Sequence, residues 1–319
     1  MKRLHWLTVA AIAALALTAG PAAAGERQIT EGEAHDLTLG GGWASWTVGD
    51  QPGQRFAWNG NTATPVNPPG YAFNLGIDAK RRPVGVYSIC GGDGTPRTGP
   101  CGLFERTLPR GRQRRLMEFK RPYSNVGADR YGSALALFRG DSVTRPDGSS
   151  RSRATFDLRR AGKRTWRWTE TGGASRIDLD RRDLVYTVSD GSDYVQVRAV
   201  DVTGRRPALR TLAGYETGCR CSSEEAALND VAVSGRYAYA SETWFQTENG
   251  QPFGGGYPTR IWGQVVRWDL TARRPAREVA QLPRPARELD VDGGRILYRG
   301  QEDSSPIYEL TDVTWTPSA

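Results

Sequence analysis

The sequence contains one phrase twice, as DVTGRRPALRTL at residues 201–212 and as DLTARRPAREVAQL at residues 269–282. In both copies an aspartate ends a short alternating run, a polar turn follows, and a proline precedes a second short run. Proline interrupts a β-ladder and is tolerated where an outer strand begins. Similarity at a fixed spacing is typical of repeat architectures. We therefore interpret each copy as the end of one strand and the turn to the outermost strand of a repeated unit.

A second pattern lies upstream of each copy and consists of an acid, a polar turn and an aliphatic–aromatic ending. The clearest examples are IDLDRRDLVY at 177–186, NDVAVSGRYAYA at 229–240 and LDVDGGRILY at 289–298, with looser versions beginning at residues 35, 77 and 126. The closing aromatic residues are Trp46, Tyr87, Phe138, Tyr186, Tyr239 and Tyr298. Their spacings of 41, 51, 48, 53 and 59 residues define six units.

The local chemistry of each unit is that of β-structure. Alternating β-branched or aromatic runs joined by polar turns predict hairpins. No stretch after residue 24 has convincing helical periodicity, although residues 222–231 are compatible with one helical turn. Repeated units of four short strands describe a β-propeller, in which blades pack face to face around an axis. We predict an all-β fold, a single β-propeller of six four-stranded blades with seven as the alternative, closed by Arg27–Thr30 adding to the last blade.

These units resemble the TolB-like and WD40-like repeats of exported bacterial β-propeller proteins. The matching residues are Asp178 and Asp180, Asp290 and Asp292, the endings Leu184-Val185-Tyr186 and Ile296-Leu297-Tyr298, and Asp201-Val202-Thr203-Gly204. The resemblance covers most of residues 30–315 and implies a fold rather than an activity. Trp268-Asp269 is similar to the WD dipeptide, but it occurs once and has no Gly-His partner, so a eukaryote-type WD40 protein is not indicated.

Residues 1–24 have the features of a secretory signal peptide. Lys2 and Arg3 precede a 14-residue apolar run from Trp6 to Ala19, and three alanines end at Ala24. A spanning helix needs about 20 apolar residues, so this run is too short to predict a membrane span. We expect cleavage near Ala24, a propeller domain over residues 25–319 and a secreted or extracytoplasmic location. The sequence does not specify an oligomeric state.

The chain is basic, with 43 Lys and Arg residues against 35 Asp and Glu residues and a formal net charge of +8. Its arginines are scattered among acids instead of forming a stripe with stacking aromatic residues. A nucleic-acid surface normally shows such a stripe. We therefore predict no nucleic-acid partner.

Export makes the four cysteines candidates for structural disulfides. The linker between Cys90 and Cys101 is rich in glycine and proline, so its ends can meet, whereas a bridge between Cys219 and Cys221 would span one residue and be strained. The two pairs belong to opposite blades of a six-blade ring, which favours local pairing. Zinc and redox roles are less favoured, because neither pair has the C-x-x-C spacing of zinc ribbons.

The unusual sequence falls in loops that we expect at one rim of the channel, over residues 88–102, 214–230 and 241–262. Aromatic rings beside hydrogen-bonding groups suit sugars, peptides or protein partners. The candidate ligand-binding residues are Trp244, Phe245, Phe253, Tyr257 and Trp262, together with Glu224 and Glu225. The alternative is that the rings fold back and cap the channel. Both glutamates and Asp230 are calcium candidates without EF-hand spacing, so no cofactor is predicted and calcium is the only one considered.

No catalytic residue is predicted. Only His5 and His35 are available, which leaves no His-rich metal site, and the recurring acids Asp178, Asp230 and Asp290 are interpreted as structural hydrogen-bonding groups. The expected function is that of an exported, non-catalytic module that binds a protein or an envelope polysaccharide. The alternatives are a structural surface protein and a carboxylate- or calcium-dependent hydrolase or lyase acting on a carbohydrate or lactone. The enzyme would need acids of perturbed pKa at the channel mouth.

Overall fold

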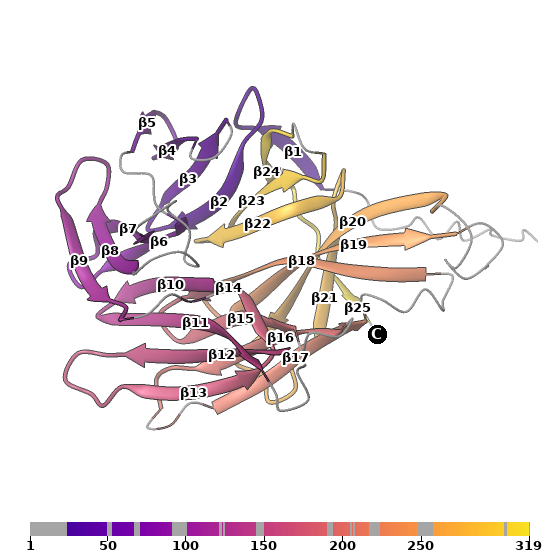
Figure 1. The fold of residues 1–319 in the computed structure, drawn as a ribbon. Helices are drawn as coiled ribbons and strands as arrows, with labels where there is room; N and C mark the ends of the chain where they lie inside the picture. Colours follow the sequence, from indigo (N-terminus) through magenta and orange to yellow (C-terminus); the bar gives the residue numbers. More distant parts are fainter. Residues whose placement is uncertain are drawn as a thin grey trace, which may run out of the picture.

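The computed structural model describes residues 24–49, 53–66, 71–90, 101–120, 123, 125–144, 150–189, 194–204, 206, 208–216, 224–247, 258–302 and 305–318. Every regular element in these ranges is a β-strand, and the sheets are arranged around a central axis (Figure 1). The predicted all-β propeller is therefore confirmed. The helical turn considered at 222–231 is wrong, because Glu224–Ser234 is a strand that pairs with its neighbour along its length.

Each blade is an antiparallel meander whose first strand lies nearest the axis and whose last strand lies outermost. Blade 1 contains β2 (His35–Gly40), β3 (Trp43–Val48), β4 (Gln54–Trp58) and β5 (Ala63–Pro65). Blade 2 contains β6 (Tyr71–Asp78), β7 (Pro83–Cys90), β8 (Cys101–Thr107) and β9 (Gln113–Glu118). Blade 3 contains β10 (Asn125–Gly132), β11 (Ala134–Thr144), β12 (Ser150–Arg159) and β13 (Trp166–Thr171).

The remaining blades follow the same plan. Blade 4 contains β14 (Gly173–Leu179), β15 (Asp183–Ser189), β16 (Tyr194–Asp201) and β17 (Ala208–Glu216). Blade 5 contains β18 (Glu224–Ser234), β19 (Tyr237–Gln246), β20 (Arg260–Asp269) and β21 (Arg277–Gln281), with β25 (Thr316–Ser318) added at its outer edge. Blade 6 contains β22 (Ala286–Asp292), β23 (Arg295–Gly300), β24 (Ile307–Thr311) and β1 (Gly25–Gln28).

Both ends of the described chain are held by strand pairing. The N-terminal strand β1 closes the ring by pairing antiparallel with β24, from Gly25 opposite Thr311 to Gln28 opposite Tyr308. This closure was predicted, although the strand begins two residues earlier than the segment 27–30. The C-terminal strand β25 pairs with β21 of blade 5, so the last segment ties blade 6 to its neighbour.

Blades 2 and 3 are joined in one eight-stranded sheet through their inner strands. The parallel bridge between β6 and β10 consists of Tyr131 opposite Ile77 and Gly132 opposite Asp78. Gly76 permits this approach, since a Cβ atom at that position would stand 2.0 Å from the carbonyl oxygen of Arg130. Divided at this bridge, the sheets give six four-stranded units, which correspond to the six sequence repeats.

The closing aromatic residues of the repeats fill the space between blades. All six are at most 5% exposed, and each lies on the second strand of its blade. Tyr186 of blade 4, for example, contacts Phe156 of blade 3 with 4.3 Å between ring centroids. These residues recur because every blade has to bury the same face against its neighbour.

The repeated phrase forms the same turn in blades 4 and 5. Asp201 accepts hydrogen bonds from the backbone N–H of Thr203 at 2.8 Å and from its hydroxyl at 2.6 Å. Asp269 accepts the equivalent bonds from Thr271 at 2.9 and 2.6 Å. An aspartate that bonds to the backbone two residues later stabilises such a turn locally. The prediction that each copy of the phrase ends the third strand of a blade and turns to the outer strand is therefore confirmed.

In the described residues there is no helix that is long and apolar enough to span a lipid bilayer.

We predict that Gly76→Ala destabilises the propeller, because the added methyl group would collide with the backbone of β10. Overpacking of this kind costs about 3 kcal/mol. Gly173→Ala is the matched control, since a Cβ there meets only Ser152 at an ordinary 3.9 Å. Chemical unfolding of both variants measures the difference. Equal stability of the two would contradict the close approach of β6 and β10.

Candidate functional site

Side-chain oxygens link the inner strands of neighbouring blades. Each of these oxygens accepts a backbone N–H group from the adjacent blade. Four aspartates at similar positions make these bonds from one blade to the next. The bonds are Asp129 to Leu179 at 2.6 Å, Asp178 to Val233 at 2.5 Å, Asp230 to Leu289 at 3.0 Å and Asp290 to Leu39 at 2.7 Å. The interpretation of the recurring acids as structural hydrogen-bonding groups is therefore confirmed.

Two junctions use a different solution. Between blades 1 and 2, the hydroxyl of Thr38 accepts the N–H of Leu75 at 2.9 Å. Between blades 2 and 3, Gly76 lets the two backbones pair directly. An inner strand has one edge facing the axis, where its N–H groups need acceptors. The four aspartates and Thr38 supply such acceptors where the strands are too far apart to pair.

A second tier of bonds lies at the end of the inner strands. The N–H of Gly42 donates to Asp292 at 2.6 Å, that of Gly293 donates to Ser234 at 3.0 Å, and that of Gly235 donates to Asp180. All three glycines have positive φ angles, between 58° and 79°. Non-glycine residues rarely adopt this conformation, so glycine fits these turns. Blades 4, 5, 6 and 1 are thus joined at two levels.

Burial strongly perturbs the acids of the channel. It raises the pKa of Asp129 to about 7 and that of Asp230 to about 6. The pKa of Asp178 is raised well above its ordinary value by burial and then by the charge of Asp129, to which it is hydrogen-bonded. Burial and the charge of Asp178 likewise raise the pKa of Asp290. Burial disfavours the charged form of a carboxyl group, and a neighbouring negative charge adds to this effect at Asp178 and Asp290.

Two polar side chains cross the channel below these acids. Arg176 lies 2.9 Å from Asp230, whose charge raises the pKa of the guanidinium. Asn74 reaches from blade 2 to the carbonyl oxygens of Ala128 at 2.9 Å and Ile177 at 3.1 Å. They line an internal void of about 10 Å³, roughly the room needed by one water molecule.

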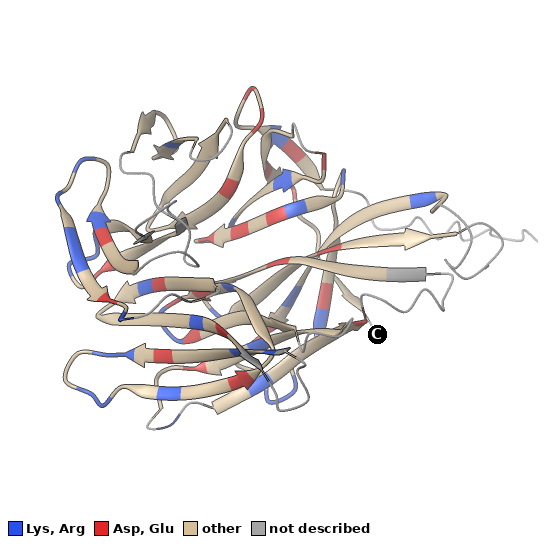
Figure 2. Cartoon of the chain, in the orientation of Figure 1, with Lys and Arg blue, Asp and Glu red and all other residues tan. Residues whose placement is uncertain are grey.

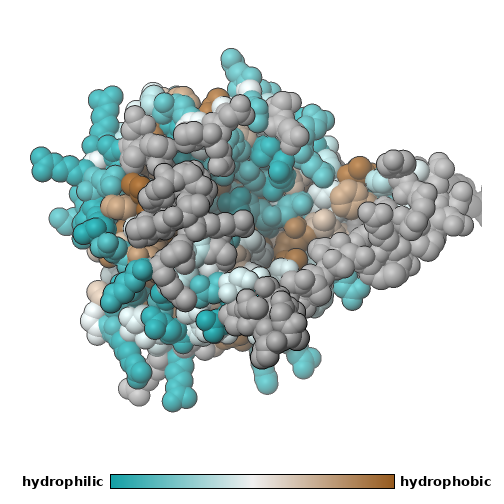
Figure 3. All heavy atoms as spheres, viewed as in Figure 1, coloured by the Kyte–Doolittle hydropathy of each residue, from teal (hydrophilic) through white to brown (hydrophobic). Residues whose placement is uncertain are grey.

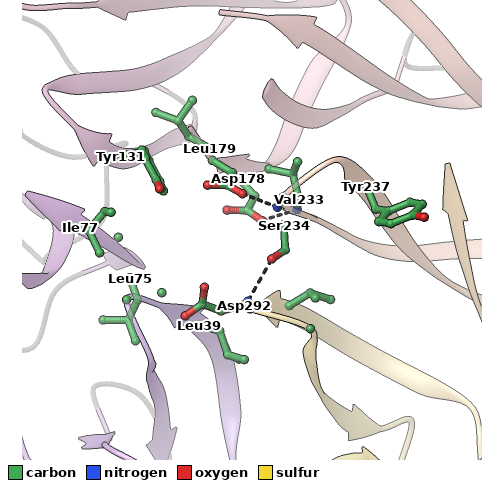
Figure 4. A pocket seen from close by; sticks show the side chains of 18 of the residues that line it. Leu39, Leu75, Ile77, Tyr131, Asp178, Leu179, Val233, Ser234, Tyr237 and Asp292 are labelled. Atoms are coloured by element: carbon green, nitrogen blue, oxygen red, sulfur yellow. Dashed lines mark hydrogen bonds between the residues drawn. The ribbon is translucent and has the colours of Figure 1, made fainter. Parts of the chain in front are cut away.

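We call Arg176 and Asn74 the plug of the channel. Above the plug lies a cavity of about 790 Å³, which we call the mouth cavity (Figure 4). It is lined by the ends of the inner strands and by the turns to the second strands. We call Leu75, Ile77 and Tyr131 its apolar wall and Asp180, Ser234 and Asp292 its polar wall. Further apolar side chains and three arginines also line it: Leu39, Leu179, Val233, Val291, Arg81, Arg236 and Arg267. In an antiparallel meander these turns lie at the rim opposite the loops between second and third strands. The cavity is therefore at the other end from the predicted rim loops.

The predicted rim carries a projecting arm, formed by residues 224–228 of β18, 243–246 of β19 and 260–263 of β20. In Figure 1 these strands extend beyond the other blades. Trp244 lies directly opposite Trp262, and their rings stack with 5.9 Å between centroids and 14° between planes. Phe245 lies opposite Ile261, which is 47% exposed. Three of the predicted aromatic residues are thus brought onto one small sheet.

The base of the arm is fixed by Glu242, a fully buried residue that sequence reasoning did not identify. Its carboxylate accepts hydrogen bonds from Tyr215 at 2.5 Å, Gln264 at 2.5 Å, Arg277 at 2.7 Å and Trp244 at 3.0 Å. The alternation of SETWF places Glu242 and Trp244 on the same face of a strand, which is the signal that could have found it. Treating 241–262 as a loop concealed this alternation.

Several predicted site residues are described in part or not at all. Phe253, Tyr257, Cys219 and Cys221 lie outside the described residues, and only the backbone is described for Glu224, Glu225 and Cys90. In the register of β7 and β8, Cys90 lies opposite the buried Cys101. Within the described ranges no three His, Cys, Asp or Glu side chains are grouped as a metal site. Asp230, a calcium candidate, bonds to Arg176 and to two backbone N–H groups.

Charged side chains of both signs are interspersed over the blades (Figure 2). Figure 3 shows hydrophilic surface around the central hollow and hydrophobic surface where the arm leaves the body.

No protein-family model matches the sequence, and no curated protein sequence matches it. Similar solved structures include the β-propeller domain of the trilobed protease from Pyrococcus furiosus, at 11% identity over 90% of this chain and 85% of that chain, with a TM-score of 0.45. The soluble aldose sugar dehydrogenase from Escherichia coli matches at 9% identity over 90% of this chain and 99% of that one, with a TM-score of 0.49. A puromycin-hydrolysing peptidase from Mycobacterium tuberculosis matches at 14% identity over 89% of this chain, with a TM-score of 0.45.

This chain spans about half the length of the puromycin-hydrolysing proteins, at 50% and 53% of those chains. At these identities the comparisons concern the fold alone. The fold is that of a β-propeller.

We predict that the free energy of unfolding falls between about pH 5 and about pH 8. An unfolded aspartate titrates near pH 4, whereas burial raises the pKa of Asp129 to about 7 and that of Asp230 to about 6. The folded state therefore binds these protons more tightly, and this stabilisation is complete below about pH 4 and lost as the pH rises through 6 to 7. Urea unfolding at several pH values measures how steeply the free energy of unfolding falls with pH.

Asp129→Asn should flatten this slope, because asparagine does not ionise and its amide oxygen can still accept the N–H of Leu179. Asp201→Asn is the control. Burial alone would raise the pKa of Asp201, but the hydrogen bonds from Thr203 hold it below its ordinary value. Asp201 therefore does not titrate between pH 5 and 8. An unchanged slope in Asp129→Asn would show that Asp129 does not carry the proton.

Proposed function

We propose that this chain is a non-catalytic binding module that recognises a protein partner at the cell envelope through the arm. The observation that carries the proposal is the stacked pair Trp244 and Trp262 on a sheet that projects from the body. Arg260 lies over the ring of Trp262 at 5.0 Å from its centroid. Tryptophan and arginine are the residue types most enriched at the centres of protein interfaces.

A protein partner suits the arm better than a polysaccharide. Ile261 is one of the few exposed large aliphatic side chains of the described residues, and with Phe245 it occupies the face opposite the tryptophan pair. Exposed aliphatic groups contribute to binding when they are buried against apolar protein surface, whereas sugars offer mainly hydroxyl groups. Polysaccharide binding is the alternative result of the binding test.

The arm is ordered before it binds. Four donors converge on Glu242 at its base, and one of them is the indole N–H of Trp244. A side chain that is already held loses less conformational freedom on association, so more of the contact energy appears as affinity. This arrangement supports recognition.

The acids of raised pKa do not support the hydrolase or lyase alternative. Asp129 and Asp230 are buried, Asp178 and Asp290 are partly buried, and each of the four accepts a backbone N–H from the next blade. Asp178 and Asp180, whose pKa values are both raised by burial, line the mouth cavity, but each is engaged with a backbone N–H of blade 5. Their perturbation is a consequence of holding the ring together.

Export and local disulfide pairing remain part of the proposal. Gly25 begins the ring-closing strand β1, so a signal peptide that ends near Ala24 would release the chain at the start of that strand. The opposed positions of Cys90 and Cys101 on β7 and β8 favour a bridge between them over one to blade 5. A TolB-like or WD40-like exported propeller agrees with these features.

We predict that Trp262→Ala weakens partner binding about tenfold or more without unfolding the protein, since interface tryptophans often contribute about 2 kcal/mol. Immobilised mature chain is incubated with detergent-solubilised envelope proteins and, separately, with purified envelope polysaccharides. Trp166→Ala is the matched control, because Arg160 also lies over that ring, at 3.7 Å, on the outer strand of blade 3.

Retention of a specific protein by the native chain and the control, but not by Trp262→Ala, supports the proposal. A large fall in melting temperature of Trp262→Ala with unchanged retention would instead show that the tryptophan pair only stabilises the arm.

A further inference from the structure

The polar wall and the apolar wall of the mouth cavity come from different blades, although apolar side chains of blades 4 to 6 and an arginine of blade 2 also line the cavity. Figure 4 shows Ile77 and Tyr131 across the opening from Ser234. The polar wall comes from blades 4, 5 and 6, whose inner strands end in Asp180, Ser234 and Asp292. The apolar wall comes from blades 2 and 3, where Gly76 draws the strands together and no acid is interposed. The asymmetry is therefore built into the way that the blades are joined.

The cavity opens onto a channel whose acids repel one another in sequence. Burial raises the pKa values of Asp180, Asp178 and Asp290, and neighbouring carboxylates raise them further. The neighbours are Asp292 for Asp180, Asp129 and Asp180 for Asp178, and Asp178 and Asp230 for Asp290. In the described residues neither Asp180 nor Asp292 forms an ion pair. The chain as a whole has a net charge of +8, so this concentration of negative charge is local. A cleft lined by charge of one sign with low-dielectric walls focuses the field at its opening.

The arginines at the rim do not cancel this field. Arg236 lies 3.5 Å from Asp269, and Arg267 lies 2.6 Å from Glu278, so both are neutralised within blade 5. Arg81 has no ion-pair partner among the described residues, and its guanidinium lies 6.0 Å from the ring of Tyr131. One unpaired cation therefore faces the two unpaired carboxylates of the polar wall.

We propose that the mouth cavity binds a small organic cation, an ammonium group attached to an apolar body. The ammonium group would donate to Asp180, Asp292 and the hydroxyl of Ser234, and the apolar body would lie against Leu75, Ile77 and Tyr131. The carboxylates retain acceptor capacity, since each ionised carboxylate offers about four lone-pair positions. Bound positive charge would also relieve the repulsion among the acids beneath it. This site is separate from the arm, at the opposite end of the propeller.

A neutral or anionic ligand fits less well. An anion would meet the acids of the channel, and a neutral polyol would leave the apolar wall against hydroxyl groups. An inorganic cation would leave the same wall unused, and the described residues contain no grouped metal ligands. The combination of both walls is what selects an amphipathic cation.

The probe is n-hexylammonium, tested by isothermal titration calorimetry on the mature chain at about pH 8. Hexan-1-ol and heptanoate have the same hexyl chain without the positive charge. We expect saturable binding of hexylammonium and at least about tenfold weaker binding of both analogues, as loss of one charge-assisted hydrogen bond implies. N-acetyl-lysine methylamide is a second cationic probe: if it binds more tightly than hexylammonium, the natural ligand is a lysine side chain, and if more weakly, a free amine.

Two substitutions should act in opposite directions. Asp292→Asn removes a carboxylate from the polar wall and should weaken binding about tenfold. Arg81→Asn removes the unpaired cation and should tighten binding several-fold. It should also fold well, because Arg81 has a φ of 63°, a conformation that asparagine tolerates better than arginine. Asp201→Asn, in the outer turn of blade 4, is the control that should leave affinity unchanged.

Equal binding of hexylammonium and hexan-1-ol, or weaker binding by Arg81→Asn, would overturn the proposal. The absence of any binding in the folded native chain would do the same. Trp262→Ala should bind hexylammonium as the native chain does, so failure of the arm to bind a protein and failure of this cavity to bind a cation are distinguished.

Discussion

The hydrogen bond from a backbone N–H of one inner strand to a side-chain oxygen of the previous blade is the interaction on which this propeller depends. Adjacent inner strands are mostly too far apart to pair directly, yet their axial edges carry N–H groups that need acceptors. Asp129, Asp178, Asp230 and Asp290 span this gap. An aspartate side chain is long enough to reach from one inner strand to the next, so four junctions are held at this separation. Where the side chain is absent, at Gly76, the strands close and the cavity wall becomes apolar.

Joining the blades through aspartates has an electrostatic cost, because it places several carboxyl groups close together along the channel. Burying several carboxylates together is unfavourable unless they are protonated, hydrogen-bonded or paired. All three remedies are available in this propeller: burial raises the pKa values of Asp129 and Asp178 and so favours protonation, backbone N–H groups donate to the carboxylates, and Arg176 pairs with Asp230. The result is an acidic axis in a basic protein, with an apolar, aromatic arm at the other end. The two proposed sites use these two features separately.

The sequence predicted the features that depend on short stretches of the chain. The closing aromatics marked the second strands, the aspartate turns marked the exits of the third strands, and their spacing gave six units. The role of the recurring acids was also accessible, because a group that recurs at the same position of several blades serves the ring. The sequence could not show which blades approach closely at the axis, since that depends on Gly76 meeting the backbone near Arg130 from a strand about 50 residues away. It likewise concealed the arm and Glu242, where strand alternation continued into a segment expected to be a loop.

The central claim is most directly tested by carboxyl-carbon NMR titration of the protein labelled at aspartate. We expect one carboxyl to titrate near pH 7 and its resonance to disappear in Asp129→Asn. We also expect a second carboxyl, that of Asp230, to titrate near pH 6. If every aspartate carboxyl titrated near its ordinary value of about 4, these groups would not be buried between the inner strands, and the account of how the ring is held together would be wrong.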